Sequence, residues 1–236
     1  MMRLTVPSWV IPGTYLENLT FLQGQPAVKG VELLFFFYDR ETQSLLQKEW
    51  KGILALRNRF SFTAHLPEPL RSLHEELVEQ TLPLTEHYIF HPGPPEDAPA
   101  LAGLIASWMN RFDRGKHRFL VENTRPGRFE ALLAYLPDEA GICMDTGHLL
   151  LEGKEPGAFY RRFKERIQEI HLHGLDYERA RIDGRLPDHR PLRLEEPWFQ
   201  EVIPVLAAFP GTVNLEVFSW EEVLESIGVL QAAGLI

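Results

Sequence analysis

A repeated alternation of short strand-like and longer helix-like segments is the feature that most restricts the fold of this chain. Runs rich in β-branched and aromatic residues recur at 3–10, 30–38, 60–65, 87–91, 118–123, 141–145, 167–173 and 212–218. Segments with helical periodicity follow them, at 15–22, 43–56, 69–79, 98–112, 128–136, 156–166, 197–208 and 220–233. Strands that alternate with helices in this way predict a parallel α/β fold.

Eight strand–helix units close most naturally into a barrel, so we expect residues 1–236 to form one (β/α)8 domain, the TIM-barrel arrangement. The last helix carries the signature of a capping box, because Ser219 stands at the expected N-cap and Glu222 follows three residues later. An open doubly wound sheet is the alternative, but no Gly-rich phosphate loop follows the first strand to favour it.

Charge and hydropathy restrict the partners and the location. The formal net charge is −9, which argues against a nucleic-acid partner because such binding needs many Lys and Arg side chains. No apolar run reaches the length of a membrane span, and the N-terminus lacks the pattern of an export signal. The single cysteine, Cys143, lies in an apolar run and is expected to be a reduced, buried thiol. We therefore expect a cytoplasmic protein, with its oligomeric state left open.

A small anionic ligand is compatible with this acidic chain, because such a ligand needs only a local positive patch. The segment 177–193 is rich in arginine and can supply that patch. The same segment is equally typical of a solvated loop, and both interpretations stay open at this point.

Residue types that bind metals stand at the expected carboxyl ends of the strands, which converge on one mouth in a β/α barrel. They include six of the nine histidines, together with two glutamates and two aspartates: His65, His91, Glu122, Asp145, His148, His171, His173, Asp188, His189 and Glu216. A single histidine there is more often a hydrogen-bonded core residue. Gathering so many ionisable groups in an apolar setting is costly unless a cation compensates them. The pattern therefore predicts a metal centre.

The mixture of imidazole and carboxylate ligands fits zinc best, with manganese, iron or cobalt as alternatives. Clustered divalent ions suit phosphodiester cleavage because they polarise the phosphoryl oxygens, acidify water and neutralise the charge on the leaving oxygen.

The ordered motifs resemble those of a known family. AHLP, FHPG, VENT, MDTGH, IHLHG and LEVF, which together run from Ala64 to Phe218, resemble the successive metal-binding motifs of the endonuclease IV (AP endonuclease, family 2) and xylose-isomerase-like barrel superfamily. The resemblance implies a centre of two or three divalent ions. The extra histidines favour the phosphate-cleaving branch over the epimerases and isomerases, which typically hold a single metal.

The same resemblance implies a role for each ligand. His65 and His91 would hold one ion, and Glu122 would bridge it to a second that is also held by Asp145, His171 and Glu216. His148 and His189 would hold a third.

One position departs from the family pattern and puts the third ion in doubt. The family carboxylate two residues before the loop histidine is replaced by Pro187, and Asp188 stands directly before His189 instead. If Asp188 cannot turn inward, the centre is dinuclear, and His148 and His189 bind phosphate or donate a proton.

A narrower resemblance, to the cobamide-remodelling phosphodiesterases, rests on VPSWVIPGTYLENLTFL, GVELLFFFYD, TAHLP, ENT, MDTGHLLLEG, IHLHG, DHRPL and NLEVFSWEE. It implies hydrolysis of the phosphodiester in the nucleotide loop of adenosylcobamides, with Glu122, Glu216 and His148 as catalytic residues.

Substrate contacts are expected from several side chains outside the metal ligands. Arginines can surround a phosphate, and Trp9, Phe36, Phe37 and Phe218 can face a flat macrocycle, although ordinary core packing is the commoner role for any one aromatic. The candidates for substrate binding are Arg125, Arg185, Arg190 and His173. His173 is expected to alternate to the opposite face of its strand from the ligand His171.

Three other functions stay open. A sugar or sugar-phosphate isomerase or epimerase would hold one divalent metal and use Glu122 and Glu216 as the acid and base. A DNA phosphodiesterase like endonuclease IV needs loops that grip a duplex, and this chain is short and acidic. A metal-binding or ligand-carrying protein would bind metal tightly without turnover.

Overall fold

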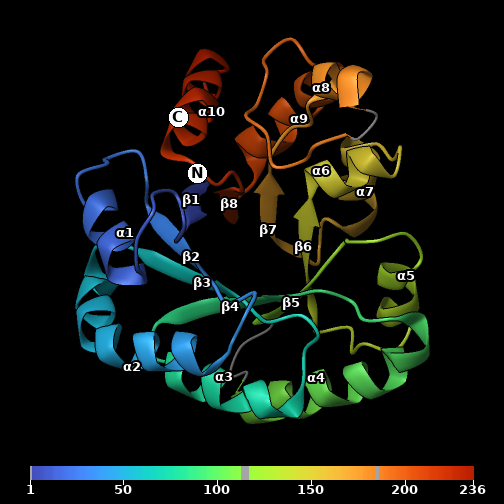
Figure 1. Ribbon diagram of the computed structural model, residues 1–236. Helices are drawn as coiled ribbons and strands as arrows, with labels where there is room; N and C mark the ends of the chain where they lie inside the picture. The colour runs from blue at the N-terminus through green and yellow to red at the C-terminus, as the bar shows by residue number, and fades with distance from the viewer. Residues whose placement is uncertain (1, 113–116, 184–185) are drawn as a thin grey trace.

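The computed structural model describes residues 2–112, 117–183 and 186–236. Within these residues, eight parallel strands close into a barrel in sequence order, and β8 pairs back to β1 (Figure 1). The strands are β1 (Arg3–Pro7), β2 (Gly30–Leu34), β3 (Ser61–His65), β4 (Thr85–Phe90), β5 (Phe119–Glu122), β6 (Gly141–Asp145), β7 (Ile167–Leu172) and β8 (Thr212–Leu215). The predicted (β/α)8 barrel is confirmed.

Helices lie on the outside of the strands (Figure 1). They are α1 (Tyr15–Leu22), α2 (Arg40–Ala55), α3 (Glu75–Thr81), α4 (Ala98–Phe112), α5 (Arg128–Leu133), α6 (Thr146–Leu151), α7 (Pro156–Phe163), α8 (Tyr177–Asp183), α9 (Pro197–Ala208) and α10 (Trp220–Ala232). Short 3-10 turns occur at η1 (Leu56–Asn58), η2 (Ser72–His74) and η3 (Pro95–Asp97). The helices cover the apolar outer face of the strands, as the alternation in the sequence predicts.

Several boundaries differ from the sequence-based expectation. The first two strands end at Pro7 and Leu34, several residues earlier than expected. The helix expected at 69–79 begins only at Glu75, because a 3-10 turn, η2, comes first. Two helices were not expected: α6 follows β6 directly, and α8 occupies part of the arginine-rich segment that was compatible with a loop.

The predicted capping box at the start of α10 is only half formed. The Ser219 hydroxyl accepts a hydrogen bond from the Glu222 backbone N–H at 3.2 Å, as an N-cap does. The Glu222 carboxylate does not return to the cap, because it pairs with Arg190, whose Nη1 lies 2.6 Å from Glu222 Oε1.

A buried asparagine positions the loop after β1 at the mouth of the barrel. Asn18, on α1, accepts hydrogen bonds through Oδ1 from the backbone N–H groups of Val10 and Ile11, each at 3.0 Å. Its amide donates back to the Ile11 carbonyl at 3.1 Å. These bonds satisfy backbone groups that would otherwise be buried without partners, and they hold the segment that carries Trp9.

Cys143 is a buried free thiol, as expected. In the described part of the chain, every helix is too short or too polar to cross a membrane. The cytoplasmic location stays a prediction.

Candidate metal centre

Closure of the barrel brings the predicted ligands together at one mouth. His65, Glu122 and Asp145 are the last residues of β3, β5 and β6, and His91 and Glu216 follow β4 and β8 directly. On β7, His171 pairs in register with Asp145 of β6. All six ligands therefore lie at or just beyond the carboxyl ends of their strands, where β/α barrels carry their active sites.

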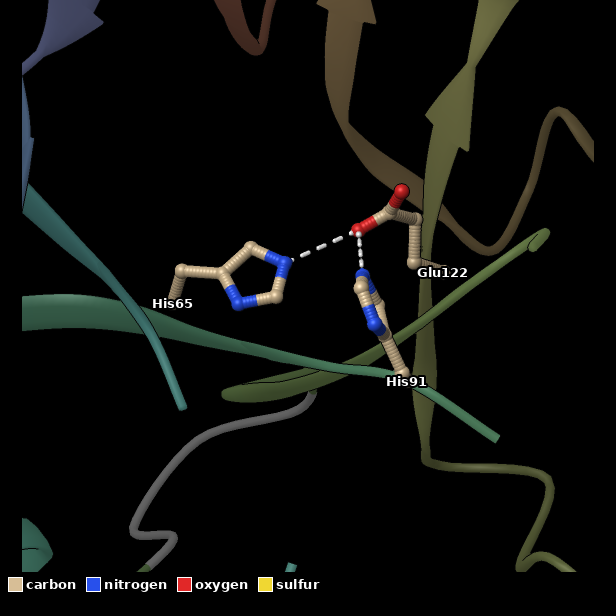
Figure 2. Close-up of side chains that lie close together, drawn as sticks. All are labelled: His65, His91 and Glu122. Carbon is tan, nitrogen blue, oxygen red and sulfur yellow. Dashed lines mark hydrogen bonds and ion pairs between the residues drawn. The ribbon is translucent and has the colours of Figure 1, made fainter. Parts of the chain in front are cut away.

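Glu122 is the centre of the cluster. Its Oε2 lies 3.1 Å from His65 Nε2 and 3.2 Å from His91 Nε2. Figure 2 shows both imidazoles directed at that one oxygen. The same oxygen is 3.7 Å from His171 Nδ1, and Oε1 is 3.6 Å from His148 Nε2. One buried carboxylate thus contacts four imidazoles, and the bridging role that the family resemblance implies for it stays a prediction.

A second group of possible ligands joins Glu122 to Asp145 and His171, with one donor atom from each within 4.8 Å of the others. Asp145 uses both oxygens. Oδ1 accepts the backbone N–H of His148 at 2.6 Å, and Oδ2 lies 3.1 Å from His173 Nε2. These bonds leave Asp145 rigidly oriented toward the centre.

A third group consists of His173, His189 and Glu216. The two rings stack with centroids 4.3 Å apart, and Glu216 Oε2 lies 3.6 Å from His189 Nδ1. His189 has a φ of 51°, in the left-handed region that is costly for a histidine. Its backbone N–H donates to His173 Nδ1 at 3.0 Å, and this bond helps to hold the ring at the mouth.

The expectation that His173 faces away from His171 is wrong. Side chains alternate along a strand with a period of two, so residues 171 and 173 share a face. The structure accordingly places His173 beside Asp145 and Glu216.

The third group also differs from the predicted set of His148, Asp188 and His189. Asp188 lies on the partly exposed loop, and its Oδ2 is 3.9 Å from His189 Nε2. The ring of His148 is 6.1 Å from that of His189 and faces Glu122. His173 and Glu216 therefore stand closer to His189 than the sequence suggested.

The predicted substrate arginines give a mixed result. Arg185 lies outside the described residues. The side chain of Arg125 is half exposed, with Nη1 3.1 Å from Glu68 Oε1, and Arg190 pairs with Glu222. Both described arginines already have carboxylate partners, so their role in substrate binding stays a prediction.

The predicted aromatic contacts lie at the rim of the mouth and not in the core. The exposed fractions of Trp9, Phe37 and Phe218 are 39%, 74% and 39%. Phe36 packs edge-on against His65, with ring centroids 4.8 Å apart, and Phe218 lies 4.9 Å from the ring of His189. The rim thus combines exposed rings with the outermost histidines.

The buried imidazoles and carboxylates compensate one another's charge. Burial opposes the protonated form of His91, but Glu122 and Glu68 outweigh it and raise the pKa of His91 to about 10. Burial is likewise outweighed by Asp145, which raises the pKa of His173 to about 9. Burial opposes the charged form of Glu122, yet His91 and His65 hold the pKa of this carboxyl well below its usual range.

The donor set fits divalent transition-metal ions. His171 Nδ1 and Glu216 Oε2 are buried and have no hydrogen-bond partner among the described residues, although they lie 3.2 Å apart. Buried polar atoms are rarely left in this way unless a ligand completes them. Neutral imidazole and ionised carboxylate are the usual ligands of zinc and of its neighbours in the first transition row.

Two buried carboxylates beneath this cluster were not predicted. Glu32 in β2 and Glu169 in β7 are fully buried, and with His171 they form a further group of possible metal ligands. Glu32 is the one polar residue of its strand, GVELL, whereas Glu169 lies in IQEIHL, which also contains Gln168 and His171. That signal was visible in the sequence, but it lies in mid-strand and not at a strand end.

Comparison with known proteins supports the fold. No family model matches the chain. Inosose dehydratase from Lacticaseibacillus casei is 36% identical over 53 residues, which are 22% of this chain and 17% of that protein. The matched segment thus spans less than a fifth of the relative's own length.

Several solved structures are similar over nearly the whole chain. The probable 3-DHS dehydratase involved in petrobactin synthesis from Bacillus anthracis has a TM-score of 0.71 at 15% identity, covering 98% of this chain and 99% of its own. A sugar phosphate isomerase/epimerase from Parabacteroides distasonis reaches 0.70 at 11% identity, with complete coverage of both chains. Endonuclease IV from Thermus thermophilus reaches 0.58 at 16% identity, covering 98% of each chain. Fold and site together define a TIM barrel with a candidate metal centre at its mouth.

Proposed function

We propose that this chain is a divalent-metal-dependent phosphodiesterase of the endonuclease IV and xylose-isomerase-like superfamily that acts on a small anionic substrate. The observation that carries the proposal is the number of imidazoles in the centre. Four histidines have a ring nitrogen within 4.0 Å of Glu122, and His173 and His189 lie equally close to Glu216. A single cation needs only part of this set, so the arrangement supports two or three ions.

The residues divide into overlapping groups in this proposal. His65 and His91 hold one cation together with Glu122, and Glu122 also reaches the group of Asp145 and His171. Glu216 joins that group to His173 and His189. Bound divalent cations polarise phosphoryl oxygens, acidify water and neutralise the charge that develops on the leaving oxygen. Glu122, Glu216 and His148 are then the catalytic candidates, because the two glutamates belong to these groups and His148 Nε2 lies 3.6 Å from Glu122 Oε1.

The rim supports a substrate that joins a phosphodiester to a flat apolar group. Trp9, Phe37 and Phe218 are exposed, and the ring of Phe218 lies 4.9 Å from that of His189. A pocket of about 390 Å³ also opens beside His91, and Arg71 is part of its wall. Adenosylcobamide has both features and is the first substrate to test. This finer assignment depends on the motif resemblance.

A sugar isomerase, epimerase or dehydratase that uses one metal is the second candidate. The partial match to inosose dehydratase and several of the similar structures favour this class more than the phosphodiesterase class. In this alternative, Asp145 and His171 help to hold a single cation, and Glu122 and Glu216 act as acid and base. Both glutamates approach the same imidazole nitrogen: Glu122 Oε2 lies 3.7 Å and Glu216 Oε2 lies 3.2 Å from His171 Nδ1.

The variant His91→Asn separates the two candidates. His91 belongs to the His65 group and lies outside the group of Glu122, Asp145 and His171. In a multinuclear phosphodiesterase the substitution removes one cation and abolishes hydrolysis. In a single-metal isomerase the cation and most of the activity survive. The matched control is His117→Asn. His117 precedes β5, at the end of the strand opposite to the centre, and its left-handed φ of 67° is one that asparagine tolerates.

The assay compares metal-loaded protein on adenosylcobamide, abasic duplex DNA and a panel of ketoses and inososes, with metal counted by elemental analysis. Cleavage of adenosylcobamide with two or more ions per chain supports the proposal. Turnover of a sugar with one ion per chain replaces it with the second candidate.

A further inference from the structure

Glu32 and Glu169 place carboxyl groups in the barrel interior beneath the metal centre. Glu169 has neighbours there: Thr63 Oγ1 donates to Glu169 Oε1 at 3.1 Å, and His87 Nδ1 lies 3.6 Å from Oε2. Glu32 Oε1 has no hydrogen-bond partner among the described residues. A fully buried carboxylate is costly unless it makes a specific interaction. Because Oε1 makes none, the interaction that stabilises Glu32 has to come from its other oxygen, Oε2.

That second oxygen contacts a predicted metal ligand. Glu32 Oε2 lies 2.8 Å from His171 Nε2, and both side chains are fully buried. The other nitrogen of the ring, Nδ1, faces the centre. It lies 3.2 Å from Glu216, 3.7 Å from Glu122 and 4.0 Å from Asp145, with no hydrogen-bond partner among the described residues. The His171 ring thus spans the distance between the interior and the mouth.

The chemistry of imidazole assigns the proton. A histidine that binds a cation through Nδ1 must present a bare lone pair there, so the ring proton resides on Nε2. Nε2–H then donates to the Glu32 carboxylate. We propose that Glu32 is a positioning residue that holds His171 in this tautomer and orientation, with Nδ1 directed at the cations.

This role rests on the proposed metal centre. It extends the set of strands that contribute to that centre. None of the predicted ligands lies on β1 or β2, whereas Glu32 brings β2 into the site through His171. Carboxylates that accept the second N–H of a metal-bound histidine typically contribute 10- to 100-fold to metal affinity. Glu32 therefore acts on binding of the cation without touching it.

A deep cation held by Glu32, Glu169 and His171 is the competing explanation, because their donor atoms lie within 4.8 Å of one another. Such an ion would take His171 Nε2 and displace the bond to Glu32. It would also need Glu169, which the positioning role does not need. Glu169 is equally buried and thus provides the matched control.

The experiment titrates metal-free protein with Zn²⁺ and compares wild type with Glu32→Leu, Glu32→Gln and Glu169→Gln. Glu32→Leu should weaken Zn²⁺ binding about 10- to 100-fold and shift the absorption bands of the Co²⁺-loaded protein. Glu32→Gln should retain most of the affinity, because its amide oxygen still accepts from Nε2–H. Glu169→Gln should bind like wild type. Loss of one bound ion in Glu169→Gln overturns the positioning role in favour of the deep cation.

A measurement on the unmutated protein covers the case in which Glu32→Leu does not fold. Nitrogen-15 NMR of Zn²⁺-loaded wild type should show His171 protonated on Nε2, and protonation on Nδ1 overturns the proposal. Wild type that binds no Zn²⁺ overturns the proposed function together with this role. Zn²⁺ binding that Glu32→Leu leaves unchanged overturns the role of Glu32 alone.

Discussion

Glu122 shows how function and stability are linked at a single residue. Its carboxylate is buried and contacts His65, His91, His148 and His171, so its charge is compensated only inside this cluster. Removing one partner from a buried ionic group leaves the others uncompensated. Substitutions here are therefore expected to change both cation binding and folding.

The substitution Glu122→Gln keeps the shape of the side chain and removes its charge. We expect loss of bound metal and a fall in turnover of more than about 100-fold. This is a larger effect than the 10- to 100-fold loss typical of residues that only orient a metal ligand. The metal-free variant should also melt at a lower temperature than metal-free wild type. Elemental analysis, kinetics and thermal melting measure the three effects, and full metal content in the variant would remove Glu122 from the centre.

Cation binding should depend on pH, because the raised pKa of His91, about 10, keeps this imidazole protonated at neutral pH. A metal binds only the deprotonated ring, so protons compete with the cation. Zn²⁺ affinity should rise as the pH increases from 6 toward 9, and binding at pH 7 should release protons. Calorimetry in buffers of different ionisation enthalpy counts these protons. An affinity independent of pH would contradict the expectation.

At the scale of elements, the junction of β6 and α6 serves two purposes. Asp145 ends the strand, and its Oδ1 caps the helix by accepting the His148 N–H. The loop is held from the other side by Asn123, whose Oδ1 accepts the Asp145 N–H at 2.8 Å. A predicted metal ligand is thus also an N-cap, so one carboxylate would serve both the cations and the helix.

Two variants of Asp145 separate these roles. Asparagine can cap a helix but lacks the charge, whereas alanine does neither, and loss of a cap costs about 0.5–2 kcal/mol. Measured without metal, Asp145→Ala should therefore be less stable than Asp145→Asn by roughly that amount. Both should lose cation binding. Equal free energies of unfolding in urea would show that the cap contributes nothing.

Sequence periodicity located the strands better than the helices. Strands of a parallel sheet are buried on both faces, so they appear in the sequence as short apolar runs whatever segments pack against them. The helix α6 escaped prediction because its first residues, Thr146 and Gly147, continue a motif read as a strand end. The helix expected at 69–79 starts late because residues 72–74 form the 3-10 turn η2, and α3 begins only after it.

For the molecule as a whole, the candidate metal centre depends on closure of the barrel. The pairing of β8 with β1 completes the ring, and the ligand residues on β3 to β8 then face one another across the mouth. Cations bound there would join six strands that are separated by up to 151 positions, from His65 to Glu216. Binding and global stability are linked in such an arrangement.

Removal of metal should lower the stability of the entire barrel. A ligand at 100 times its Kd adds about 2.7 kcal/mol to the free energy of unfolding. Protein treated with EDTA should melt at a lower temperature in one transition, and added Zn²⁺ should restore the original value. Mg²⁺ serves as the control, since it prefers oxygen ligands. A melting temperature insensitive to EDTA would argue against tightly held ions.

Local patterns of polarity along the chain were enough to predict the number and order of the strand–helix units and the residue types at the carboxyl ends of the strands. Which donors meet became known only from the folded chain: His173 lies beside Asp145, His189 beside Glu216, and Glu32 beneath His171. Those contacts depend on strand register and on the curvature of a closed sheet, which set distances between residues far apart in the chain.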